Sequence, residues 1–113
     1  MRVDHKFDEL AFFADVKKRP AVYFGQPSLI SLRDMLTGME YAFQFNQEPA
    51  QLHYYRAFVA WYHNEILDDG NGYACWWNHI LYVSGNDDRY AFERFFVIFE
   101  CYLHDVHGLS VVL

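Results

Sequence analysis

The chain has 113 residues, of which 53% are hydrophobic, 20% aromatic and 21% charged, and this composition excludes disordered, collagen-like and linker-dominated proteins. A chain of this length can bury one core, so we predict a single domain over residues 1–113. The formal net charge is −6 and no lysine follows residue 18, which argues against nucleic acid and anionic membranes as partners.

The first predicted helix covers residues 7–17, because Phe7, Leu10 and Ala14 share one helical face. Pro20 is expected to end this helix, since proline lacks an amide hydrogen and disfavours helical backbone before it. Residues 19–27 are then predicted to form an extended connector that leads to the next helix.

A long second helix is predicted from Ser28, whose hydroxyl can cap it, to about Gln47. Its apolar residues recur at spacings of three and four, and they are Leu29, Leu32, Leu36, Met39 and Phe43. Pro49 suits the first turn of a third helix. The apolar stripe of that helix consists of Leu52, Tyr55, Val59, Tyr62 and Ile66.

Residues 68–72 are predicted to form a turn, because glycine and asparagine tolerate positive φ. The aromatic segment 73–84 is predicted to be a helix, with a buried strand as the alternative. Asn86 or Asp87 is expected to cap a last helix that ends at about His107, before a C-cap at Gly108. The apolar residues 109–113 must dock on the domain or meet a partner.

These elements predict an all-α domain of about five helices. The many aromatic residues favour an irregular orthogonal array over a regular bundle, because large rings fill the space between helices that cross at uneven angles. Cys75 and Cys101 lack the number and spacing of a disulfide scaffold, so we interpret both as reduced core residues. With no signal peptide and no membrane-spanning run in the sequence, we expect a protein of the cytoplasm.

No motif in the chain predicts a reaction, so we expect neither catalysis nor a cofactor. A metal site is nevertheless an alternative, because histidines and a carboxylate recur at helical spacing near the end of the last helix. These candidate ligands are Glu100, His104 and His107, with His63 or His79 from a neighbouring helix. We prefer a structural interpretation, in which histidines in a last helical turn interact with the helix dipole.

Acidic residues on both sides of segment 73–84 form a second candidate site. A negative rim of this kind would attract and orient a cationic protein, with an aromatic side chain as an anchor. The candidate residues are Trp61, Glu65, Asp68, Asp69, Asp87 and Asp88. The same acidic residues are also typical of turns and helix caps, and this structural interpretation stays open.

The segment around Pro20 carries a family resemblance. Residues 17–25, Lys-Lys-Arg-Pro-Ala-Val-Tyr-Phe-Gly, resemble the K-R-P-x-M-Y-x-G signature of small, mostly uncharacterised bacterial proteins, with Val22 at the usual Met position. Further matches are Ser28-Leu29, Trp76 or Trp77 before Ile80, Gly85-Asn86-Asp87-Asp88 and Phe95-Phe96. The resemblance implies a relationship to immunity-type partners of bacterial toxins, and it implies no activity.

The signature residues themselves are interpreted as structural. Lys18 and Arg19 are expected to donate to carbonyls at a helix end, and Pro20 to stop that helix. Tyr23 is expected to anchor the connector, and Gly25 to permit the turn toward Ser28.

Three functional hypotheses follow from the sequence. The preferred one is an acidic protein-binding module of the toxin–immunity type, whose partner would be a basic toxin domain. The second is a metal-dependent enzyme that uses the histidine and glutamate cluster. The third is a homodimer that buries the additional aromatic residues and the tail 109–113.

Overall fold

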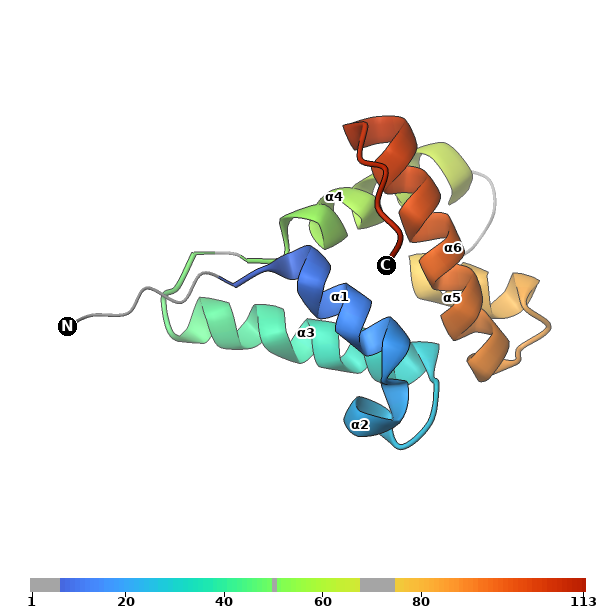
Figure 1. Ribbon diagram of the computed structural model, residues 1–113, viewed down its shortest axis with the longest axis horizontal. Coiled ribbons are helices and arrows are strands. Elements are labelled where there is room, and N and C mark those ends of the chain that lie inside the picture. The colour runs from blue at the N-terminus through green and yellow to red at the C-terminus, as the bar shows by residue number, and fades with distance from the viewer. Residues whose placement is uncertain (1–6, 50, 68–74) are drawn as a thin grey trace.

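Six α-helices and one π-helix make up the regular structure of the computed structural model, which describes residues 7–49, 51–67 and 75–113 (Figure 1). These ranges contain no strand, and the all-α prediction is confirmed. The elements in chain order are α1 (Glu9–Lys18), α2 (Pro20–Phe24), α3 (Leu29–Phe45), α4 (His53–Tyr62), the π-helix η1 (His63–Leu67), α5 (Trp76–Val83) and α6 (Asp88–His107).

Side chains at three helix starts satisfy amides that have no partner within the helix. Asp8 accepts from the amide of Ala11, and Ser28 accepts from that of Ser31, each at 3.0 Å. Asp87, rather than Asn86, is the cap of α6 and accepts from Tyr90 N at 3.0 Å. The predicted caps at Ser28 and Gly108 are therefore confirmed, since Gly108 ends α6 with a φ of 68°.

The connector between the first two long helices is not extended, so this prediction was wrong. Pro20 does end α1, but it also begins the short helix α2, which continues to Phe24. Proline suits the first position of a helix because its fixed φ is helical and no amide hydrogen is needed there. Gly25 then closes α2 with a φ of 77°.

The third predicted helix begins later than its sequence indicates. α4 starts at His53 rather than near Pro49, with Leu52 as an N-cap that has no side-chain acceptor. The missing acceptor comes from α1, because the Glu9 carboxylate accepts from Tyr54 N at 2.9 Å and from Tyr55 N at 2.7 Å. A residue 45 positions away thus determines where this helix can begin.

Segment 73–84 is confirmed as helical over Trp76–Val83, whereas its first two residues and the predicted turn 68–72 lie outside the described residues. α5 packs against α6, which also contacts α3 and α4 and so holds the domain together. The helices cross at steep, uneven angles (Figure 1), as the irregular array requires.

Aromatic rings fill the space between these helices. Phe58 of α4 is fully buried, and its ring lies 5.3 Å from that of Phe99 and 5.5 Å from that of Phe95. Phe13 of α1 lies 4.9 Å from Phe99 on another side. The edge-to-face geometry of the Phe58 pairs is the arrangement that aromatic quadrupoles favour.

The C-terminal tail docks on the domain, which is the first of its two predicted outcomes. Leu109 and Leu113 pack against the core, while Val112 is 91% exposed. The amide of Leu113 donates to Glu100 Oε1 at 3.0 Å, and Lys17 Nζ of α1 donates to the same oxygen at 2.9 Å. The tail runs back toward α1 in Figure 1.

Both cysteines are free thiols, but neither is a core residue, so the prediction of core positions was wrong. Cys75 is partly buried, and Cys101 is exposed on α6. Helical spacing explains the exposure of Cys101, because it lies about half a turn away from the face that contains the buried Phe99 and Leu103. None of the described helices has the length and apolar character that crossing a membrane requires.

Candidate functional site

The acidic candidate residues at the start of the last helix accept hydrogen bonds from other residues of the domain. Asp87 caps its own helix, as described above. Asp88 Oδ1 accepts from Ile30 N at 3.0 Å and Asp88 Oδ2 accepts from Ser28 Oγ at 2.5 Å, which attaches the start of α6 to the start of α3. Glu65 is exposed in η1, and Asp68 and Asp69 lie outside the described residues.

The proposed aromatic anchor of that site is also part of the packing. Trp61 is partly buried, and its ring lies 5.0 Å from the ring of Tyr102. Phe58 on the same helix is fully buried, and Tyr54 packs its ring 5.1 Å from the His107 imidazole. The aromatic side chains of α4 that lie outside its predicted apolar stripe therefore pack against the domain and offer little surface to a partner.

The signature segment builds a small polar network at the end of α1. Asp15 Oδ1 accepts from Arg19 Nε at 2.8 Å, and Asp15 Oδ2 accepts from Tyr23 Oη at 2.5 Å. These bonds hold the pKa of the Asp15 carboxyl below its ordinary value, and the bond from Tyr23 has the larger effect. Arg19 thus pairs with a carboxylate rather than with the expected carbonyl, whereas Lys18 is exposed.

The histidine cluster is not brought together. Glu100 pairs with Lys17, His104 contacts the neighbouring Asp105 at 2.9 Å, and His107 Nε2 lies 2.7 Å from the hydroxyl of Tyr102. Over the described residues, no group of three or more histidine, cysteine, aspartate and glutamate side chains is arranged to hold a metal ion. The position of His63 on η1, at the far end of α4, adds no ligand to these residues.

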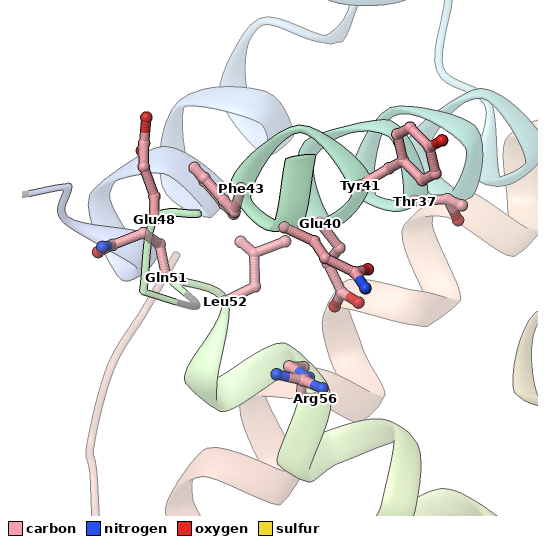
Figure 2. Close-up of a pocket in the computed structure, with 9 residues that line it drawn as sticks. Thr37, Glu40, Tyr41, Phe43, Glu48, Gln51, Leu52 and Arg56 are labelled. Atoms are coloured by element: carbon pink, nitrogen blue, oxygen red, sulfur yellow. The ribbon is translucent and has the colours of Figure 1, made fainter. Parts of the chain in front are cut away.

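An open pocket of about 490 Å³ lies between the C-terminal half of α3 and the start of α4 (Figure 2). Its walls combine aromatic and aliphatic side chains with two carboxylates, two side-chain amides and one guanidinium. The lining residues are Thr37, Glu40, Tyr41, Phe43, Gln44, Glu48, Gln51, Leu52 and Arg56. α3 contributes the first five, and the others come from the connector and α4.

Two aromatic side chains beside this pocket are exposed to an unusual degree. Tyr41 is 69% exposed and Phe45 is 77% exposed, and both lie on the last two turns of α3. A second, smaller hollow of about 220 Å³ is lined by Tyr41, Gln44 and Phe45, so it shares two residues with the pocket. Large exposed aromatic residues that adjoin a hollow are typical of surfaces that bind other molecules.

Glu40 is the pocket residue whose hydrogen bonding is incomplete. Its Oε1 atom is buried and, within the described ranges, has no hydrogen-bond partner. In Figure 2 its carboxylate points from α3 toward Arg56 of α4, yet the structure records no ion pair between the two side chains. Burial is the main cause that raises the pKa of the Tyr55 hydroxyl, and the negative charge of Glu40 raises it further.

Sequence reasoning missed this site, although one signal for it was available. The apolar stripe of the second predicted helix contains Met39 and Phe43, whereas Tyr41 and Phe45 fall on its opposite side. Aromatic residues on the polar side of a predicted helix are candidates for a contact surface. Glu40 and Arg56 carried no comparable signal, because only folding brings the two helices together.

Comparison with known proteins does not identify the chain: no family model matches it, and neither a curated protein nor a solved structure is significantly similar to it. The resemblance to the K-R-P-x-M-Y-x-G proteins therefore stays a prediction.

Proposed function

We propose that this protein is an acidic protein-binding module and that it binds its partner through the α3–α4 surface. We define this surface by Glu40, Tyr41, Phe45, Glu48 and Arg56. The observation that carries the proposal is the exposure of two adjacent aromatic side chains, 69% for Tyr41 and 77% for Phe45, at the edge of an open pocket.

The energetics of aromatic burial support a protein as the ligand. Each aromatic side chain offers roughly 150–250 Å² of surface, and burying apolar area stabilises a complex by about 25 cal/mol per Å². Tyrosine is also enriched among the few residues that dominate interface energies. Two exposed rings on one rigid helix can therefore anchor a partner with little loss of conformational entropy.

The charge of the molecule supports a basic partner. Beyond residue 20 the chain has four arginines, no lysine and eleven acidic residues. A field of this sign accelerates encounters with a positively charged protein and slows those with acidic ones. A basic toxin domain, as implied by the family resemblance, is the narrower form of this proposal.

The test compares two doubly substituted variants in proximity capture from the native cell. Tyr41→Ala with Phe45→Ala removes the proposed anchors, and Tyr90→Ala with Val97→Ala removes two exposed side chains of α6 as a matched control. We expect a captured protein to be lost with the first variant and kept with the second. That protein, once purified, should bind the wild type with one-to-one stoichiometry and more weakly at high salt.

The proposal fails if every captured protein is retained by the Tyr41→Ala, Phe45→Ala variant, or is lost equally with the control. Circular dichroism checks that both variants remain folded. We expect this result because substitutions at exposed positions lower the free energy of unfolding by less than about 0.5 kcal/mol. The products of genes that neighbour this one are the first purified proteins to titrate.

A further inference from the structure

One carboxylate oxygen of the α3–α4 surface lacks the donor that its position demands. Glu40 Oε1 is buried, and within the described ranges no group donates a hydrogen bond to it. Leaving a charged acceptor unsatisfied costs more than leaving a neutral one, so this site favours any ligand that brings a donor. The terminal torsion of glutamate is broad, and a small rotation can turn this oxygen into the pocket.

The cationic side chains nearby do not supply that donor. Arg33, two turns earlier on α3, forms an ion pair with Asp34 at 2.8 Å and stacks its guanidinium 4.3 Å from the centre of the Trp77 ring. Its Nε atom is buried and bonds no acceptor among the described residues, Glu40 included. Arg56 lines the same pocket but forms no recorded ion pair with Glu40. The pocket therefore contains an acceptor to which no described residue donates, together with Glu48 as a second negative charge.

The walls of the pocket suit a long side chain with a charged end. Phe43 and Leu52 provide apolar surface, along which the methylene groups of lysine or arginine can pack. The pocket is open to solvent and Tyr41, which lines it, is exposed, so a side chain from a docked protein can enter it. With two carboxylates and one guanidinium in its lining, the pocket carries an excess of negative charge.

We propose that this pocket receives a lysine or arginine side chain of the partner protein, with the Glu40 carboxylate as the acceptor of its charged end. This inference rests on the proposed function, because it assigns the chemistry of the residue that the α3–α4 surface recognises. Arg56 is the one cationic side chain among the lining residues, and the incoming side chain forms the ion pair with Glu40 that Arg56 does not form.

The test uses N-acetyl-lysine N-methylamide and N-acetyl-arginine N-methylamide as probes, since their only charge is on the side chain. The neutral norleucine analogue is the control probe. We expect both charged probes, but not the norleucine analogue, to give saturable amide chemical-shift changes in residues 37–44 and 51–56 of the ¹⁵N-labelled protein.

Matched variants assign the acceptor. Glu40→Gln should weaken probe binding by about tenfold, as expected for the loss of a charge-assisted hydrogen bond. Glu48→Gln makes the same change in charge in the same pocket and should weaken binding by less than about twofold, because an exposed charge is screened. Arg56→Gln should strengthen binding by about twofold, because it removes a screened competing cation.

Three results would overturn the inference: no saturable shift in the wild type, equal losses for Glu40→Gln and Glu48→Gln, or weaker binding by Arg56→Gln. The last would identify a ligand that also carries an acceptor for Arg56. The Phe45→Ala variant separates this inference from the proposed function, because Phe45 does not line this pocket; it should weaken partner capture while keeping the probes. If partner capture depends on Tyr41 and Phe45 but no probe binds, the proposed function stands and this inference fails.

Discussion

A single carboxylate, that of Glu9, connects the start of α1 to the start of α4. It is 7% exposed and accepts the two backbone hydrogen bonds that the N-cap Leu52 cannot accept. Burial is the largest influence on this group and raises its pKa above the ordinary value of 4.5, although the amides of Tyr54 and Tyr55 act in the opposite direction. One residue thus affects both the geometry of two helices and the pH dependence of stability.

Replacing Glu9 by alanine should lower the free energy of unfolding by about 2 kcal/mol, because two amides at the start of α4 lose their acceptor. Urea unfolding followed by circular dichroism measures the change. Glu65→Ala, at an exposed position of η1, is the control and should cost less than about 0.5 kcal/mol. Equal losses for the two variants would contradict the capping role of Glu9.

The raised pKa of Glu9 predicts a pH dependence with a definite sign. The folded state binds the Glu9 proton more tightly than the unfolded state does. The free energy of unfolding should therefore fall as the pH rises from about 4.5 through the folded-state pKa. Glu9→Gln cannot titrate, so urea unfolding between about pH 4 and pH 7 should show a smaller decline for this variant. Parallel curves for the two proteins would show that Glu9 has no raised pKa.

At the scale of elements, the start of α6 holds the start of α3. Asp88 accepts from both the hydroxyl of Ser28 and the amide of Ile30, while Ser28 itself caps α3. One acidic residue of the predicted partner-binding rim, Asp88, therefore joins two helices through a bond between residues 60 positions apart in the chain. Capping from another element couples the formation of one helix to the position of the next.

This coupling is measurable in a double-mutant cycle. Asp88→Ala and Ser28→Ala should show an interaction energy of about 1 kcal/mol, because the two side chains share a hydrogen bond. Asp87→Ala and Ser28→Ala should be additive within about 0.5 kcal/mol, since the Asp87 side chain bonds the amide of Tyr90 in its own helix rather than Ser28. Additivity in both cycles would mean that the Asp88 contact contributes nothing to stability.

At the scale of the whole molecule, the C-terminal tail closes the domain. Leu113 returns to α6 through the Glu100 carboxylate, which at the same time binds Lys17 of α1. The Glu100 carboxylate thereby connects the tail both to the first helix, α1, and to the last helix, α6. Val112, between two residues that are partly buried, faces the solvent.

Two neighbouring substitutions test the docking of the tail. Leu113→Asp should lower the free energy of unfolding by about 1–2 kcal/mol, because a charge replaces an apolar side chain packed on the core. Val112→Asp should change it by less than about 0.5 kcal/mol. Thermal unfolding measures both, and similar melting temperatures for the two variants would contradict the docked position of Leu113.

The sequence predicted the helices well where local chemistry determines them. The caps at Ser28, Asp87 and Gly108 use side chains or backbone within three residues of the helix end, so a reading of the chain can find them. The helix α2 was missed because proline both disfavours the helix before it and suits the start of the helix after it, and the sequence pattern does not separate these effects.

The candidate site was largely unpredictable for a related reason. Trp61 and Asp88 have side chains that suit a binding surface, but the fold uses both of them internally. Conversely, Glu40 acquires its significance only because α4 lies opposite it and no donor from the described part of the chain reaches its Oε1 atom.

The amino-acid sequence by itself determined the helical class, most helix positions and the acidic character of this protein, since periodicity, capping and charge are properties of short segments. Tertiary structure alone decided that Glu9 and Asp88 bond to distant helices and that Glu40 Oε1 has no donor among the described residues. The reason is that each such contact joins residues brought together by packing, as in the 45-residue separation between Glu9 and Tyr54.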